Sequence, residues 1–298
     1  VIELMFWENV VSFIKTMSVV LVLMLSACST VSEPTYEIIS TFSDKTVENI
    51  LAEADKNTLI LLDCDEVLIT PQEIAFSPKN IENTCAYAKS YLSERMDAAA
   101  VDKLIFSVRE QCEFELINKN WPEIIQNLQS NGVKTALLTA HWTGEAHGRP
   151  HVEELRKNEL KSLGFNFGKS WLNVGKISFN ELPATSHHKF IRYPIFDNGI
   201  IFSCNLEKGV VLEAFLKRVP YKFSKVIFID DRRKNVKSVM NTCKENGISC
   251  IGIEYKRGEV LDNEKSTFEE LKPRIDNLVK TKKWQTIHRN LKDMHAQK

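Results

Sequence analysis

Short apolar runs alternate with amphipathic segments along most of the chain. Apolar runs predict strands at residues 58–62, 133–138, 225–229 and 248–253, and the segments around them predict helices at 44–56, 122–128, 208–217 and 235–245. Two of these helices stop at Asn-Gly pairs, at 131–132 and 246–247, a common C-terminal signal. The run TLILL at 58–62 is apolar throughout, which is typical of a strand buried on both faces. This alternation predicts an α/β fold with a doubly wound parallel sheet.

Three further segments add detail to this pattern. Residues 72–120 contain few helix breakers and predict mostly helix. Residues 195–202 read IFDNGIIF, in which the Asn-Gly pair predicts the turn of a β-hairpin. The segment from Thr267 onward is predicted to be helical and basic.

The N-terminal region predicts a targeting segment. Residues 17–27 are almost entirely apolar and follow Lys15, but they are shorter than the roughly 20 residues that span a bilayer. Their length fits the apolar region of a secretory signal. They end in Leu-Ser-Ala before Cys28, which resembles a bacterial lipobox. That resemblance implies a signal peptide over 1–27, a lipid on Cys28, a tether over 28–43 and a place in the bacterial cell envelope, facing the periplasm.

Three alternatives to a lipoprotein signal remain. The N-terminal region could be a buried helix or an uncleaved anchor. The chain could also be a cytoplasmic enzyme with a misassigned start. With Cys28 lipidated, six of the seven cysteines remain, an even number that permits disulfides in an oxidising compartment. Cys85 with Cys112 and Cys243 with Cys250 are the candidate pairs.

The composition narrows the class of protein. The chain has 39 basic and 39 acidic residues, and 43% of its residues are hydrophobic. A disordered chain would be less apolar and carry more net charge. A protein that binds nucleic acid through phosphate contacts would show a basic excess, so no nucleic-acid partner is expected. The composition therefore predicts an ordinary folded protein.

Polar residues follow three of the predicted strands. Asp63 and Asp65 follow the first, Thr139 ends the second, and Asp230 and Asp231 follow the third. Because the carboxyl ends of parallel strands share one edge of the sheet, these residues should meet there. Four close carboxylates cannot all stay ionised without a cation. Oxygen ligands without histidine or cysteine favour Mg²⁺ as that cation.

In this order of motifs the sequence resembles the haloacid dehalogenase (HAD) superfamily of phosphotransferases. The motifs are Asp63-Cys64-Asp65-Glu66-Val67-Leu68, then Thr139, then Lys208 at the start of a helix, then Asp230-Asp231. The resemblance covers residues 58–255, points to a bacterial branch of unknown function and implies a HAD-like Rossmannoid fold. It implies a core over 44–70 and 121–279, a helical cap insertion over 71–120, a second insertion over 141–204 and a basic C-terminal tail over 280–298.

The resemblance also implies a Mg²⁺-dependent phosphomonoester hydrolase that acts on a small phosphorylated substrate. Asp63 would be the nucleophile and form an aspartyl-phosphate. Asp65 would protonate the leaving alcohol and then activate water. Thr139 and Lys208 would hold the phosphoryl oxygens.

The same resemblance supplies the ligands of the ion. Mg²⁺ would bind the carboxylates of Asp63 and Asp230 and the backbone carbonyl of Asp65. Asp231 would bind the ion through water or orient Lys208. Glu66 is expected to be structural.

Other interpretations stay open at this point. Asp63 and Asp65 could be a surface pair, and Lys189 and Lys217 are nearby alternatives to Lys208. The histidines between 141 and 188 favour a polar loop over a zinc site, although His141 could touch substrate. In a rival hypothesis the chain is a catalytically inactive HAD-like lipoprotein that acts as a binding or scaffold protein. The membrane would be a partner through the N-terminal lipid anchor, and the oligomeric state is undetermined.

Overall fold

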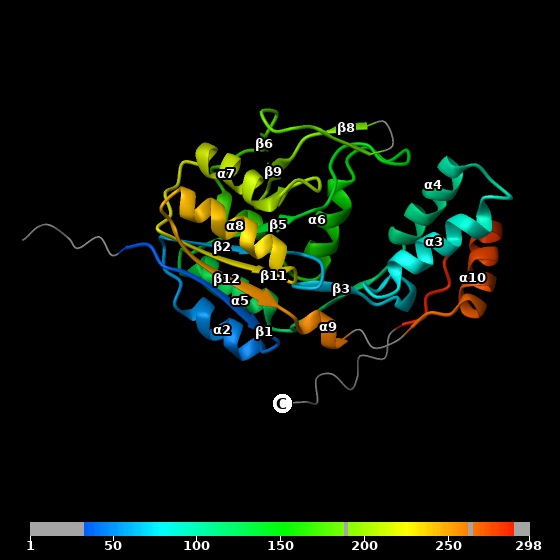
Figure 1. The fold of residues 1–298 in the computed structure, drawn as a ribbon, viewed down its shortest axis with the longest axis horizontal. Helices are drawn as coiled ribbons and strands as arrows, with labels where there is room; N and C mark the ends of the chain where they lie inside the picture. Colours follow the sequence, from blue (N-terminus) through cyan, green and yellow to red (C-terminus); the bar gives the residue numbers. More distant parts are fainter. Residues whose placement is uncertain (1–32, 188–189, 262–264, 289–298) are drawn as a thin grey trace, which may run out of the picture. The chain divides into compact units, whose positions relative to one another are not determined.

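A computed structural model describes residues 33–187, 190–261 and 265–288, and its centre is an eight-stranded sheet (Figure 1). In spatial order the strands are β1 (Tyr36–Thr41), β12 (Ser249–Tyr255), β11 (Lys225–Asp230), β2 (Thr58–Leu62), β5 (Lys134–Thr139), β10 (Ile200–Phe202), β9 (Ile195–Asp197) and β6 (Ile177–Ser178). In this order, the neighbouring strands from β1 to β10 pair in parallel, whereas β10 with β9 and β9 with β6 pair antiparallel. The prediction of an α/β fold with a mostly parallel sheet is confirmed.

Helices pack on both faces of the sheet (Figure 1). One face is covered by α2 (Asp44–Ala52), α5 (Trp121–Ser130) and α6 (Glu153–Ser162), and the other by α7 (Lys208–Arg218) and α8 (Arg233–Glu245). The strand β2 serves both faces: Ile60 and Leu62 face α2 and α5, whereas Leu59 and Leu61 face α7 and α8. Every side chain of β2 is therefore buried, which explains why its sequence does not alternate.

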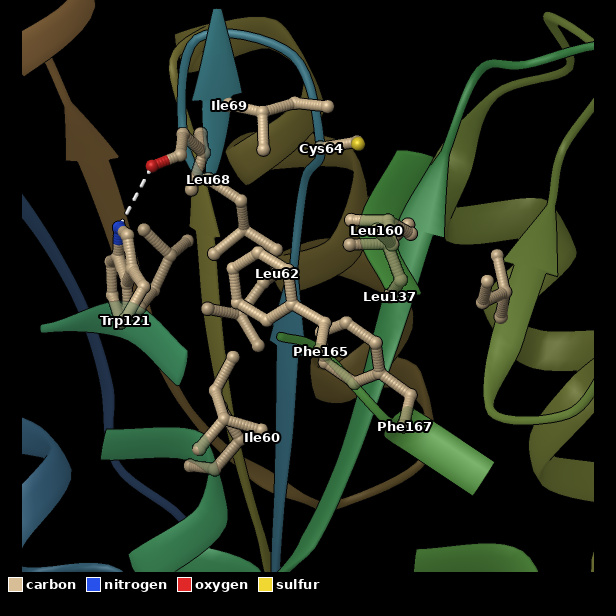
Figure 2. Packing of buried hydrophobic residues seen from close by; sticks show 14 of the residues in the cluster. Ile60, Leu62, Cys64, Leu68, Ile69, Trp121, Leu137, Leu160, Phe165 and Phe167 are labelled. Atoms are coloured by element: carbon tan, nitrogen blue, oxygen red, sulfur yellow. Dashed lines mark hydrogen bonds between the residues drawn. The ribbon is translucent and has the colours of Figure 1, made fainter. Parts of the chain in front are cut away.

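Figure 2 shows the packing on the face covered by α5. The indole Nε1 of Trp121 donates a hydrogen bond of 2.9 Å to the carbonyl of Val67, so the buried polar atom of this ring is satisfied. Its ring packs with Ile60 and Leu62 in the same cluster. Each such aliphatic side chain contributes about 1.5–3 kcal/mol when it is fully buried. This packing holds the segment after β2 in place.

A second group of helices forms its own apolar cluster. It contains the 3₁₀ turn η1 (Ile74–Phe76), α3 (Ile81–Leu92), α4 (Ala98–Arg109) and α10 (Phe268–Thr281). The antiparallel strands β3 (Ile69–Pro71) and β4 (Phe114–Leu116) connect α3 and α4 to the sheet. The mostly helical character predicted for 72–120 is confirmed. We call α3, α4 and α10 the cap helices.

The structure corrects the predicted domain boundaries at the C-terminal end. The helix α10 lies in the range assigned to the core, but it packs with α3 and α4. The reason is the buried carboxylate of Glu73, which accepts hydrogen bonds from Arg274 at 2.5 Å, Trp284 at 2.9 Å and the Ile287 amide at 2.9 Å. A buried carboxylate requires such partners. Part of the predicted basic tail, including Trp284, is therefore packed against the cap helices.

Two other predicted ranges contribute strands to the main sheet. Residues 36–41 were predicted to belong to the tether, but they form β1, which pairs in parallel with β12 along its whole length. The apolar side chains of β1 are half-buried by this pairing. Within the range 141–204, predicted to be a second insertion within the core, β6, β9 and β10 extend the main sheet. The rest of this range contains η2 (Phe167–Trp171) and the two-stranded pair β7 (Thr185–His187) and β8 (Phe190–Arg192). The predicted Asn-Gly hairpin is confirmed as β9–β10, with positive φ at both turn residues.

Some predictions concern residues that the structure does not describe. The predicted signal peptide and Cys28 lie outside the described residues, as do the last ten residues of the predicted tail. Among the helices that are described, which also include the short α9 (Arg257–Leu261), none has both the length and the apolar character needed to cross a membrane. The six described cysteines are free thiols, so neither candidate disulfide is formed.

Candidate functional site

Three carboxylates meet at the carboxyl edge of the sheet. Asp63 directly follows β2, Asp230 is the last residue of the neighbouring strand β11, and Asp231 comes next. One oxygen from each lies within 4.8 Å of the others. Among the described residues, no other group of three or more His, Cys, Asp or Glu side chains comes together in this way, and no histidine belongs to it.

Lys208 lies between two of these carboxylates. As the first residue of α7, it places its ammonium Nζ 2.8 Å from Asp63 and 2.6 Å from Asp230, and only 2% of its side chain is exposed. Burial disfavours the charged lysine, but the two carboxylates outweigh this effect and raise its pKa. Of the alternatives, Lys217 instead pairs with Glu213 on the surface, and Lys189 lies outside the described residues.

Asp230 is held by its own segment as well as by Lys208. Its carboxylate accepts hydrogen bonds from the Arg232 amide at 2.8 Å and from the Asn235 side chain at 3.0 and 3.1 Å, and the residue is fully buried. Asn235 comes from the first turn of α8. Asn235 was not predicted as a site residue, because an asparagine in a first helical turn is common and carries no spacing signal.

Burial, together with the neighbouring charges, raises the pKa of two of the carboxyls. Burial raises the pKa of Asp63 to about 8; Lys208 acts against this, and Asp230 and Asp231 add to it. Burial, followed by the charge of Asp230, raises the pKa of Asp231 to about 6. When all three are ionised, Lys208 neutralises only part of their charge. A set of oxygen ligands with excess negative charge suits a hard divalent cation, so Asp63, Asp230 and Asp231 could hold Mg²⁺.

Asp65 is separate from this group. Its carboxylate accepts hydrogen bonds of 2.8 and 3.0 Å from Nη2 of Arg156, which lies on α6. Burial opposes ionisation, but the charges of Arg156 and Arg109 hold the pKa of Asp65 below its usual value. Arg156 has no distinguishing signal in the sequence, because α6 reads EELRKNELKS and nothing in that pattern shows which of its many charged residues are buried.

Thr139 lies at the same edge, one strand from Asp63. It ends β5, which pairs with β2 up to Leu62 and Leu137, and its side chain is buried. Its hydroxyl oxygen accepts a hydrogen bond of 3.2 Å from the amide of His141. The Nδ1 atom of the His141 ring forms a hydrogen bond of 2.8 Å with the carbonyl of Trp142. Burial, together with the charges of Arg156 and Arg109, lowers the pKa of His141 to about 3. His141 is therefore neutral at ordinary pH.

A pocket of about 410 Å³ opens above these residues. At the sheet edge, the pocket is lined by Asp63, Asp65, Asp231 and Lys208. On the opposite side, it is lined by four residues of the range 71–120, namely Phe76, Ile81, Arg109 and Phe114. Asn205 and Arg232 also reach the pocket and were not predicted. Glu66 borders it but also accepts a hydrogen bond of 2.7 Å from Thr70, which fits the structural role expected for it. The pocket is thus mixed, with charged walls near the carboxylates and apolar walls toward the cap.

Related proteins occur in species of Rickettsia and Chlamydia. An uncharacterized protein of Rickettsia prowazekii is 27% identical over 229 residues, covering 76% of this chain and 78% of that protein. A protein of Chlamydia trachomatis named "Putative outer membrane protein" is 25% identical over 241 residues, covering 78% of this chain and 82% of that protein. A Chlamydia pneumoniae protein with a similar name is 21% identical and covers 92% of this chain and 93% of its own length.

No solved structure matches the chain. The family described as "Protein of unknown function (DUF2608)" matches residues 40–297, which include the whole sheet edge and the cap helices. The chain therefore belongs to the DUF2608 family.

Proposed function

We propose that this protein is a Mg²⁺-dependent phosphomonoester hydrolase of HAD type, with a Rossmannoid core, that acts through an aspartyl-phosphate. The observation that carries the proposal is the group formed by Asp63, Asp230, Asp231 and Lys208, of which all but the fully buried Asp230 line a pocket. The motif order and the parallel sheet support the same assignment. The substrate would be a small phosphorylated molecule, because the pocket holds about 410 Å³.

In the first step, a carboxylate oxygen of Asp63 attacks phosphorus, the bond from phosphorus to the leaving oxygen breaks, and protonated Asp65 would give its proton to the leaving alcohol. Lys208 lies 2.8 Å from Asp63, so its ammonium would stabilise the charge that moves onto the phosphoryl oxygens. The hydroxyl of Thr139 would also donate to a phosphoryl oxygen, as the resemblance implies; in this structure it is buried, accepts a hydrogen bond from the His141 amide and does not line the pocket. Mg²⁺ bound by the three carboxylates would screen the nucleophile from the phosphate charge.

In the second step, the carboxylate of Asp65 accepts a proton from water as the water oxygen bonds to phosphorus. The bond between phosphorus and the Asp63 oxygen breaks, and inorganic phosphate leaves. Asp65 is suited to this step because its lowered pKa keeps it ionised, and because about half of its side chain is open to the pocket.

The test is hydrolysis of p-nitrophenyl phosphate and a panel of natural phosphoesters by the purified chain from residue 28. We expect turnover that depends on Mg²⁺ and falls by at least about 10³-fold in Asp63→Asn, which removes the nucleophile but keeps its shape. Circular dichroism confirms that the variant is folded. If the wild-type chain hydrolyses none of these substrates in the presence of Mg²⁺, the proposed activity is wrong.

One observation favours the rival function, a HAD-like binding or scaffold protein without turnover. Arg156 occupies both oxygens of Asp65, and an ionised carboxylate is a poor proton donor to an alcohol. Orthovanadate is a phosphate analogue that separates the two functions. Binding of vanadate with Mg²⁺ in calorimetry, together with no hydrolysis of any phosphoester, would favour the binding protein.

We also propose that the protein is exported and anchored in the cell envelope by a lipid on Cys28. The apolar run at 17–27 and the names of the chlamydial relatives support this location. Expression of the full chain in a bacterium and mass spectrometry of the N-terminal peptide test it. We expect a chain that begins at a diacylated Cys28, whereas an unprocessed chain with an unmodified Cys28 would contradict the proposal.

A further inference from the structure

Four side chains of alternating charge connect Asp65 to the cap helix α4. Arg156 donates to both oxygens of Asp65, and its Nη1 lies 3.3 Å from Glu159. Glu159 in turn accepts hydrogen bonds of 2.5 and 3.0 Å from Arg109, the last residue of α4. The order is therefore acid, base, acid, base, from the site to the cap. When both oxygens of a carboxylate accept hydrogen bonds from an arginine, the orientation of the two groups is well defined.

Arg156 is the most enclosed member of this chain. Only 3% of its side chain is exposed, compared with 51% for Asp65, so the arginine lies inside the protein and the carboxylate faces the pocket. The ring of Phe114 lies 5.8 Å from the guanidinium of Arg156 and 4.4 Å from that of Arg109. Packing therefore restricts both guanidinium groups, and a restricted group can hold its partner in one orientation.

We propose that Arg156 is a positioning residue that aims the Asp65 carboxylate at the attacking water, and that Glu159, on the same helix α6, and Arg109, on the cap helix α4, complete this arrangement. The inference rests on the proposed function and concerns its second step. Water attack on the aspartyl-phosphate requires a base held in one direction, and a displacement of about 1 Å can cost on the order of 10²-fold in rate. Because Arg109 lies on α4, hydrolysis of the aspartyl-phosphate would be fast only when α4 has the position it has in this structure.

p-Nitrophenyl phosphate isolates this step, because its phenolate leaves without a proton from Asp65. In Arg156→Gln the first step should proceed and the second should be slow, so the phosphorylated enzyme accumulates. Rapid mixing with Mg²⁺ should show a burst of about one p-nitrophenolate per enzyme, followed by a steady rate on the order of 10²-fold below wild type. Asp65→Asn should show the same burst, and the double variant should be no slower than Asp65→Asn alone.

Two further variants keep the test decisive. Arg156→Lys retains the charge but not the fork of donors, so it should show the same burst with a smaller loss even if Arg156→Gln fails to fold. Lys157→Gln is the matched control, because Lys157 is the next residue on α6 and pairs with Glu154 and Asp197, away from the pocket. It should show no burst.

The outcomes separate the two proposals. A burst in both Arg156 variants and in Asp65→Asn, but not in Lys157→Gln, supports the positioning role. If the wild-type enzyme is active but the Arg156 variants show no burst, or lose the burst and the steady rate equally, the positioning role alone is overturned. A wild-type enzyme without turnover overturns the proposed function and this inference with it.

Discussion

Asp63 stands between groups that act on its charge in opposite directions. Lys208 stabilises the carboxylate from 2.8 Å, whereas burial and the neighbouring Asp230 and Asp231 favour the protonated form. The balance raises the pKa of Asp63 to about 8 and that of Asp231 to about 6. At the scale of single residues, ionising all three carboxyls is therefore unfavourable without a cation, and a bound cation would offset that cost.

This balance predicts how stability depends on pH without divalent ions. Because the folded pKa of Asp63 lies above its unfolded value of 3.8, the folded state binds a proton that the unfolded state has lost. The resulting stability is complete below about pH 4 and is lost as the pH rises through about 8. In EDTA, the Tm of the wild-type chain should fall by about 3 °C or more from pH 5 to pH 8.

Asp63→Asn is the control for this prediction, since the amide does not ionise and its Tm should fall less over the same range. Adding Mg²⁺ at pH 8 should restore the wild-type Tm, because the ion binds the ionised carboxylates, and should affect Asp63→Asn less. Equal pH profiles for the two chains in calorimetry would show that Asp63 does not have a raised pKa.

The position of Lys208 depends on how closely two helices approach each other. Gly209 follows Lys208 on α7, and a Cβ atom there would lie 2.5 Å from the Ser238 carbonyl and 2.7 Å from the Thr242 hydroxyl of α8. The glycine is needed for this close approach, and its amide donates to the Ser238 hydroxyl at 3.0 Å. The contact between these helices thus sets where the ammonium lies.

Gly209→Ala should therefore disturb both stability and the site. The added methyl must push α7 away from α8, at a cost of about 1–3 kcal/mol, and should move Lys208 from its carboxylates. Urea unfolding measures the stability, and the Mg²⁺-dependent rise in Tm reports on the site. Val210→Ala, on the exposed side of the same helix, should change neither. An unchanged midpoint in Gly209→Ala would mean that α7 adjusts at no cost.

The cap helices depend on one buried carboxylate. Glu73 is fully buried and binds Arg274 of α10, which is itself only 5% exposed. Glu73→Gln would leave the charge of Arg274 buried without its partner, which should destabilise the protein by about 3–5 kcal/mol. Amide hydrogen exchange of residues 268–288 should become faster. Glu269→Gln, at an exposed position of α10, is the matched control and should leave this exchange unchanged.

At the scale of the whole molecule, the sheet begins with a strand that the amphipathic pattern does not reveal. The strand β1 covers one edge of β12 from Tyr36 to Thr41. A chain that starts at Ser43 retains the N-cap of α2 but exposes that edge, and an unpaired edge is both less stable and prone to association. Its Tm should be lower by about 5 °C or more than that of a chain that starts at Thr35. Equal Tm values would show that β1 contributes nothing to stability.

The elements that the sequence predicted well are those in which local pattern and tertiary role agree. The strands β2, β5 and β11 are apolar because both of their faces are covered, and the helices between them end at clear signals. The strand β1 was missed because its side chains are only half-buried or exposed, so its mixed polar and apolar pattern resembles a linker. The helix α10 was placed in the core because a sequence does not state which of two apolar clusters a helix joins.

The sequence by itself determined the order of strands and helices, and with it the residues that end the central strands. Because parallel strands share one edge, Asp63, Thr139 and Asp230 had to lie near one another once the fold was correct. Only the tertiary structure decided the partners of each carboxylate. Lys208 and Arg156 reach the site from helices that are distant in sequence, and their roles depend on burial and direction, which a linear pattern does not encode.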